Sequence, residues 1–224
     1  MKSQKTNFLL PLIIISNLFP LYGVLRYNWT IFSVVYIYWM ELLIISTFQL
    51  LKIFFSQGDK KATFLTKLGI AIKFFLFRTG IFFFYLLFIV VFLGFLVTGH
   101  QKFSGTGMAE TMLLRNPFFN VVLLNFVAYN FVEFIVVFLL MQEYKTSLPG
   151  DHFVIFDSHM IVVHIVVVLG SFLYEFVLKN FHANHHVAMI ACICLFIFVK
   201  ICVDIGRQNM ENSGGPKEIT SKYI

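Results

Sequence analysis

Several charged or polar residues lie inside apolar stretches of this chain, where they could pair with one another or move protons. They are Glu41, Asn130, Glu133, His164, Lys200 and Asp204. A charge at the centre of a bilayer costs roughly 3 kcal/mol or more, so each must be paired, neutral or in contact with water inside a bundle. Carboxylates, an imidazole and an amine are also the groups that move protons through membranes. Two roles therefore stay open: links between helices, and a path for protons or small solutes.

The spacing of these residues places them at similar depths. Counted at about 1.5 Å per residue, Glu41 lies near the bilayer midplane, and Glu133, His164 and Lys200 lie on the order of 10 Å from the cytoplasmic face. Asp204 is one helical turn beyond Lys200 and on the same helix face. We therefore expect one polar layer in the inner half of the membrane, drawn from several helices.

The layer has a structural and a functional interpretation. In the structural one, Glu41 or Glu133 pairs with Lys200 and asparagines bond across helices, each contact contributing about 0.6 kcal/mol. In the functional one, the same groups line a transport pathway. Two acids facing one base leave a carboxylate without a cation, so the sequence does not decide between the two.

The histidines raise the question of a metal or haem. His164 is deep in an apolar run, where it could relay protons or bind metal, haem or a quinone, although a lone helix histidine is more often a hydrogen-bonded link. His182, His185 and His186 lie close together in a loop, and we expect them to be solvated. The sequence therefore predicts no bound metal or cofactor, with a site at His164 as an alternative.

The composition is that of a membrane protein. Hydrophobic residues make up 59% of the 224 residues, charged residues only 12%, and the mean hydropathy is +0.85. A globule in water would lack the polar surface to cover itself. The net charge of +6 comes from residues scattered at the ends of apolar runs, so we expect the lipid bilayer and other membrane subunits as partners and no nucleic acid.

Six stretches are long enough to cross a bilayer, at about 20 residues for each crossing. We expect an all-α polytopic bundle in one domain, residues 1–206, followed by a polar cytoplasmic tail, residues 207–224. The connections are expected to be an interfacial helix at Ser56–Leu76 that leads into the third span, coil at Thr98–Pro117 with Pro117 beginning the fourth helix, and a polar turn at Gln142–Asp157. The predicted spans are Phe8–Leu25, Trp29–Phe55, Phe77–Val97, Phe118–Met141, Phe156–Leu178 and Val187–Ile205.

Basic residues set the orientation, because they gather on the cytoplasmic side of membrane proteins. With the N-terminus inside, most lysines flank the inner side, including Lys52, Lys60 and Lys61, against few outside, such as Arg26 and Arg115. We therefore predict that both termini are cytoplasmic, in a bacterial inner membrane.

Several short motifs together resemble an uncharacterised family of prokaryotic multi-pass membrane proteins, known only as a domain of unknown function. The motifs are Asn17–Val24, Tyr38–Glu41, Glu143-Tyr144, His164–Gly170 and Lys200–Asp204, and the resemblance covers about residues 8–206. It implies a helical bundle and no particular activity.

The chain departs from this family in its third span. Relatives have His-Tyr-Gly where this sequence has Arg78-Thr79-Gly80, and Phe84 stands where a further histidine is expected. If the histidines of relatives hold a cofactor, this chain has lost it. Arg78 instead adds a cation near the inner face, where it could pair with Glu41 or Glu133.

No catalytic fingerprint is present, such as H-E-x-x-H, G-x-S-x-G or a P-loop, which disfavours an enzyme. The sequence thus predicts a structural or accessory subunit of a membrane complex. The alternatives are a proton-coupled or small-solute transporter that uses Glu41, Glu133, His164 and Lys200, and a haem-, metal- or quinone-binding protein that uses His164.

Overall fold

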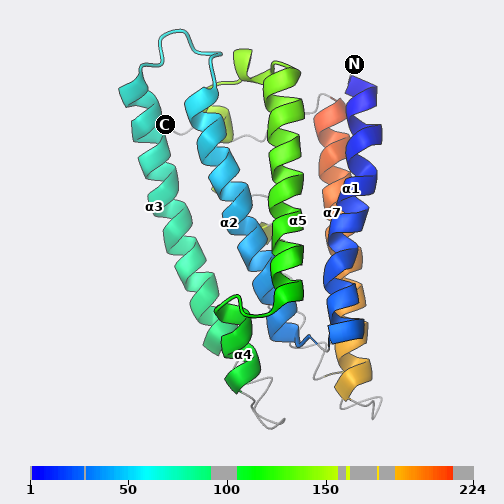
Figure 1. Cartoon of the computed structure of the whole chain (residues 1–224). Coiled ribbons are helices and arrows are strands. Elements are labelled where there is room, and N and C mark those ends of the chain that lie inside the picture. The colour runs from blue at the N-terminus through cyan, green and yellow to red at the C-terminus, as the bar shows by residue number, and fades with distance from the viewer. Residues whose placement is uncertain are drawn as a thin grey trace.

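The computed structural model is a bundle of long helices (Figure 1), and it describes residues 2–27, 29–91, 105–155, 160–161, 176 and 185–213. Every regular element in these ranges is helical. In chain order they are α1 Lys2–Tyr27, α2 Ile31–Phe55, α3 Phe64–Phe88, α4 Gly105–Met112, α5 Pro117–Glu133, the π-helix η2 Phe134–Leu140, the 3-10 turns η3 Glu143–Lys145 and η4 Pro149–His152, and α7 His185–Ser213.

Helix α2 is the centre of the bundle. It lies beside α5, with α3 on its other side and the pair of α1 and α7 beyond α5 (Figure 1). Helices α1, α3, α4, α5 and α7 all contact α2. Residues 32–39 of α2 are buried without a break, so this part of the helix is enclosed all round, as expected where a helix is largely apolar on every face.

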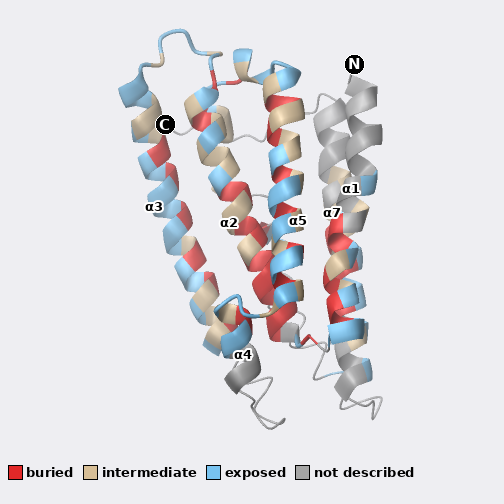
Figure 2. Ribbon diagram, in the orientation of Figure 1, coloured by how far each residue is buried: buried red, intermediate tan, exposed pale blue. Residues whose placement is uncertain are grey.

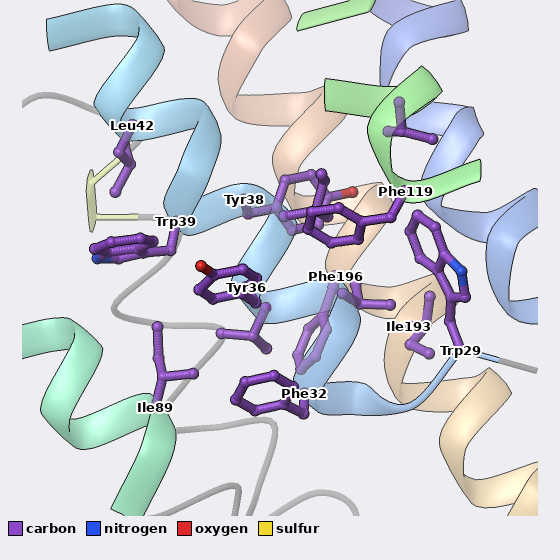
Figure 3. Packing of buried hydrophobic residues seen from close by; sticks show 14 of the residues in the cluster. Trp29, Phe32, Tyr36, Tyr38, Trp39, Leu42, Ile89, Phe119, Ile193 and Phe196 are labelled. Carbon is purple, nitrogen blue, oxygen red and sulfur yellow. The ribbon is translucent and has the colours of Figure 1, made fainter. Parts of the chain in front are cut away.

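Aromatic rings fill the core around α2. Tyr36 stacks on Phe32 and on Trp39, with ring centroids 5.7 and 5.5 Å apart, and it also stacks on Phe119 of α5 at 5.9 Å (Figure 3). The indole Nε1 of Trp39 donates a hydrogen bond of 3.2 Å to the carbonyl of Phe82 and so ties α2 to α3. Ring pairs at these separations add to the stabilisation from burial alone.

Three helical stretches in the described part are long and apolar enough to cross a membrane: Phe32–Phe55, Phe64–Val91 and Ala109–Leu140. The first has 24 residues, about 36 Å of helix, against a hydrocarbon core of about 30 Å. The outer side of α3 is exposed along its length (Figure 2), and it presents large apolar residues such as Phe83, Phe84 and Leu87. This distribution suits contact with lipid.

Helix boundaries follow local capping signals. Thr30 and Thr63 accept hydrogen bonds from the amides of Ser33 and Thr66 and begin α2 and α3. Asn116 caps α5, whose first residue is Pro117, so the prediction that this proline begins the fourth long helix is confirmed.

The structure bears on two predictions about the connections. In the region Ser56–Leu76, Thr63 caps a helix that begins at Phe64 and continues unbroken to Phe88, so a helix does lead into the third span, and its position at the membrane interface stays a prediction. The region Thr98–Pro117 is not all coil, since it contains α4, which a hydrogen bond of 3.2 Å between the hydroxyls of Thr111 and Ser33 holds against α2. The predicted span Phe156–Leu178 lies almost wholly outside the described residues, and the number of spans stays a prediction.

Helix α7 extends past the predicted end of the last span. It begins at His185 and runs through Gly206 to Ser213, so the first residues of the expected polar tail are helical. The start of α1 and the end of α7 lie at the same end of the bundle as the connection from α2 to α3 (Figure 1).

At that end, the connection after α2 is bonded to the turn after η2. The amides of Gln57 and Gly58 donate to the carbonyls of Tyr144 and Ser147 at 2.7 and 2.9 Å. The hydroxyls of Ser56 and Ser147 are 3.1 Å apart. A Cβ atom on Gly58 would lie 2.6 Å from the carbonyl oxygen of Thr146, so the close approach of the two backbones requires glycine here.

We therefore expect Gly58→Ala to destabilise the fold by about 1–3 kcal/mol, because the clash is with backbone that has no rotamer to change. Gly150→Ala is the matched control, since a Cβ there meets nothing within 4 Å. Thermal unfolding of the purified variants in detergent measures both. Equal midpoints for the two variants would contradict the assigned contact.

Candidate functional site

Besides Ser33, which bonds to Thr111 of α4, helix α2 carries three polar positions that reach charges or polar groups on three other helices. Glu41 meets α7, Ser46 meets α3 and Lys52 meets α5. Glu41 and Lys52 are eleven residues apart, which is about 16 Å along the helix axis. The predicted layer is therefore distributed along α2 rather than gathered at one point.

The deepest contact is an ion pair between α2 and α7. The ammonium Nζ of Lys200 donates to Oε1 of Glu41 at 3.1 Å, and the two side chains are only 4% and 7% exposed. This is one of the two pairings that the sequence allowed for Lys200. An ion pair this far from water is stabilising only if its geometry and remaining hydrogen bonds compensate the loss of hydration.

Aromatic rings surround the ammonium group of this pair. Nζ of Lys200 lies 5.4 Å from the ring centroid of Tyr38 and 6.0 Å from that of Phe126. The two rings are themselves 6.4 Å apart, one on α2 and the other on α5. Both distances fall in the range of cation–π attraction. The cation thus contacts a carboxylate and two ring faces from two helices.

A second ion pair joins α2 to α5 nearer the end of the bundle. Nζ of Lys52 is 3.2 Å from Oε1 of Glu133, and the side chains are 17% and 23% exposed. Glu133 is the last residue of α5 before the chain continues as the π-helix η2. Its carboxylate therefore meets Lys52 rather than forming the alternative pair with Lys200.

Arg78 on α3 is buried to 2% exposure and fastens α3 to α2 and to the segment after η4. Its Nε donates to the hydroxyl of Ser46 at 2.9 Å, and Ser46 in turn donates to the carbonyl of Leu42 at 2.7 Å. Its Nη1 donates to the carbonyl of Ile155 at 2.5 Å and to that of Val154 at 3.4 Å.

Two phenylalanine rings of α3 flank this guanidinium. Cζ of Arg78 is 5.8 Å from the ring centroid of Phe74 and 5.4 Å from that of Phe82. The planar fork of arginine suits this combination of several fixed acceptors and ring faces. The pairing of Arg78 with Glu41 or Glu133 stays a prediction.

The amide of Asn130 bonds within its own helix, and two further buried amides lie on α2 and α5. Asn130 donates from Nδ2 to the carbonyl of Phe126, four residues back in its own helix, at 2.9 Å. Nδ2 of Asn125 and Oε1 of Gln49 are buried and have no hydrogen-bond partner in the described part of the chain. The contacts between helices that are described at this depth are those of Glu41, Ser46 and Lys52.

Some predicted site residues cannot be placed. His164 and His182 lie outside the described residues. Asp204, His185 and His186 belong to α7, but their side chains are not among those described. Within the described residues, no three His, Cys, Asp or Glu side chains come close enough to hold a metal ion.

Sequence reasoning did not select Lys52 and Ser46 for the site. Lys52 follows the apolar run of α2 and looks like an ordinary interfacial cation, and a serine in a helix usually bonds its own backbone. The signal for both lies in their spacing on α2, because Ser46 and Lys52 follow Glu41 toward one end of the bundle. Only the positions of α3 and α5 in the structure show that Ser46 and Lys52 each reach a partner on another helix.

Comparison with known proteins agrees with the resemblance found in the short motifs. The sequence model of a family described as a family of unknown function, DUF6498, matches residues 1–219. No curated protein and no solved structure matches the chain.

The burial of the two ion pairs predicts different sensitivities to mutation. Glu41→Gln leaves the Lys200 cation buried without its carboxylate, and should cost about 3 kcal/mol or more. Glu133→Gln removes the partner of Lys52, a cation that water can reach, and should lower the free energy of unfolding by about 1 kcal/mol. Midpoints of thermal unfolding in detergent measure both.

A double variant separates lost attraction from stranded charge. Glu41→Leu with Lys200→Met should be more stable than either single variant, because no uncompensated charge remains. If the double variant loses as much free energy of unfolding as the two single variants together, the two residues do not interact.

Proposed function

Because the chain belongs to DUF6498, a family of unknown function, we propose its role from the geometry: it is an integral protein of a bacterial inner membrane that serves as a structural or accessory subunit of a membrane complex. Its interior charges hold helices together. The observation that carries the proposal is the Glu41–Lys200 ion pair, 3.1 Å long and buried, which joins α7 to α2.

The compensation of charge supports a structural interior. Glu41 and Glu133 each have a lysine from another helix at hydrogen-bond distance, and Arg78 is directed at fixed backbone carbonyls. A transport pathway needs groups that exchange partners with a solute or with water. Charged groups that packed helices hold in place instead fix the positions of those helices. A subunit needs such fixed helices in order to present a defined outer surface.

The outer surface supports contact with lipid. Along α3 the exposed residues are large and apolar, including Leu76, Phe83 and Phe84, each more than half exposed. At the end of the bundle where α1 begins, Lys60 and Lys61 are exposed, and at the opposite end Arg26 and Arg115 are. We place the first end in the cytoplasm, following the bias of basic residues.

Native mass spectrometry tests the accessory role. Protein extracted from its own membranes in polymer-bounded lipid particles should appear in a complex heavier than the 26.0 kDa monomer. The same preparation with Glu133→Gln is a control for folding, since that pair is partly exposed. A monomer alone, from protein that still unfolds cooperatively, would contradict the proposal.

A flux measurement tests the transporter alternative. In proteoliposomes with an internal pH-sensitive dye, an accessory subunit should give no proton flux above that of empty vesicles. A flux that Glu41→Gln abolishes, while the folded protein is retained, would favour the proton-coupled transporter instead.

Labelling of single cysteines tests the orientation. In a variant with its native cysteines replaced, Lys60→Cys should react with a membrane-impermeant maleimide only after the membrane is opened, and Arg115→Cys should react in intact spheroplasts. Both positions are exposed, at opposite ends of the bundle (Figure 1). The reverse pattern would place the termini outside.

A further inference from the structure

The surroundings of the Lys200 ammonium have the chemistry of a ligand site as well as of an ion pair. We infer that Glu41, Tyr38 and Phe126 form a binding site for a primary ammonium group, and that the Lys200 side chain is its intramolecular ligand. This ammonium site goes beyond the proposed accessory role and does not depend on it. It concerns which cation the three residues bind, whereas the accessory role concerns which proteins the chain binds.

The distances support this assignment. The Glu41 carboxylate accepts from Nζ at 3.1 Å, and the Tyr38 and Phe126 ring centroids are 5.4 and 6.0 Å from the same atom. A carboxylate combined with ring faces is the arrangement that recognises organic ammonium ions, since the ring faces are negative and need no hydrogen bond. Hard metal cations instead require six or more oxygen ligands, or an octahedral set with several waters, which one carboxylate and two rings do not supply.

The three residues are held in place independently of Lys200. Glu41 and Tyr38 are both buried residues of α2, three positions apart and so on one face. Phe126 is buried on α5, at 1% exposure, and contacts Tyr38 across the helix interface. Removal of the lysine side chain should therefore leave an open, preformed site rather than a collapsed one.

Two other cations of the described residues, Arg78 and Lys52, lack this combination of a carboxylate and two ring faces. Arg78 also lies against two rings, but its described acceptors are the Ser46 hydroxyl and backbone carbonyls. Lys52 has a carboxylate, Glu133, and no aromatic ring within cation–π distance is described for it. Lys52 therefore serves as a matched control: a lysine–glutamate pair of similar length that lacks the ring faces.

Chemical rescue tests the ammonium site. Lys200→Ala removes the atoms from Cγ to Nζ, which together correspond to propylammonium. We expect propylammonium, at a concentration about ten times its dissociation constant, to raise the unfolding midpoint of Lys200→Ala in detergent by about 3 °C. 1-Propanol, which has the same size but no charge, and tetramethylammonium, which has no N–H donor, should raise it by less than half as much.

Two variants show where the ligand binds. Lys52→Ala should gain no more from propylammonium than the native chain does, and Lys200→Ala combined with Glu41→Gln should lose the response. An equal response to 1-propanol would mean that the ligand only fills a cavity, and an equal response of Lys52→Ala would mean that any exposed carboxylate suffices. Either result, or no response of folded Lys200→Ala, would overturn the inference.

A measurement in cells covers the case in which Lys200→Ala does not fold alone. Neutral propylamine crosses membranes, so cells that produce the variant are grown with propylammonium or with 1-propanol. The yield of monodisperse protein on size-exclusion chromatography should rise at least twofold with propylammonium only. An unchanged yield would overturn the inference. Failure of either rescue leaves the accessory role intact, because that role is tested by the mass of the extracted complex.

Discussion

The Glu41–Lys200 ion pair is the constraint on which the arrangement of this bundle depends. Two opposite charges inside an apolar interior must meet, because either one alone would be stranded in a medium that cannot solvate it. Glu41 is near the middle of α2 and Lys200 is on α7, so their contact at 3.1 Å fixes how the pair of α1 and α7 faces the rest of the bundle. The rings of Tyr38 and Phe126 then have a defined cation to pack against.

The same constraint explains why α2 is the centre of the fold. Its polar residues are spaced so that each faces a different neighbour: Glu41 faces α7, Ser46 faces Arg78 on α3, and Lys52 faces Glu133 on α5. The aromatic residues that precede Glu41 on α2 belong to the buried core beside these contacts. Apolar packing alone is tolerant of rotation and sliding between helices, whereas charged contacts in lipid are not. The polar residues therefore supply register, and the apolar residues of the core supply the packing around them.

Local signals in the sequence gave good predictions where the physics is local. Asn116-Pro117 begins α5 because an asparagine cap and a proline in the first turn satisfy the end of a helix without help from other elements. The region Ser56–Leu76 was predicted as a helix that leads into the third span, and Thr63 does begin one continuous helix there. The sequence did not indicate that Lys67 donates to the carbonyl of Phe54. Contacts such as that between Gly58 and Ser147 have no signal in sequence, because the two loops meet only after the helices have packed.

The sequence by itself determined that this chain is helical, apolar enough for a membrane, a member of its family, and obliged to pair Glu41 and Lys200 with something. The pairing of a buried charge is required by solvation, which depends on residue type and depth alone. Which charge meets which was decided only by tertiary structure: Lys200 had two acids within reach by depth, and Lys52 gave no sign of being a partner. The choice follows from the rotation and tilt of α5 and α7 about α2. The rotation and tilt of these helices are set by many side chains that pack at the same time, so no single stretch of sequence predicts them.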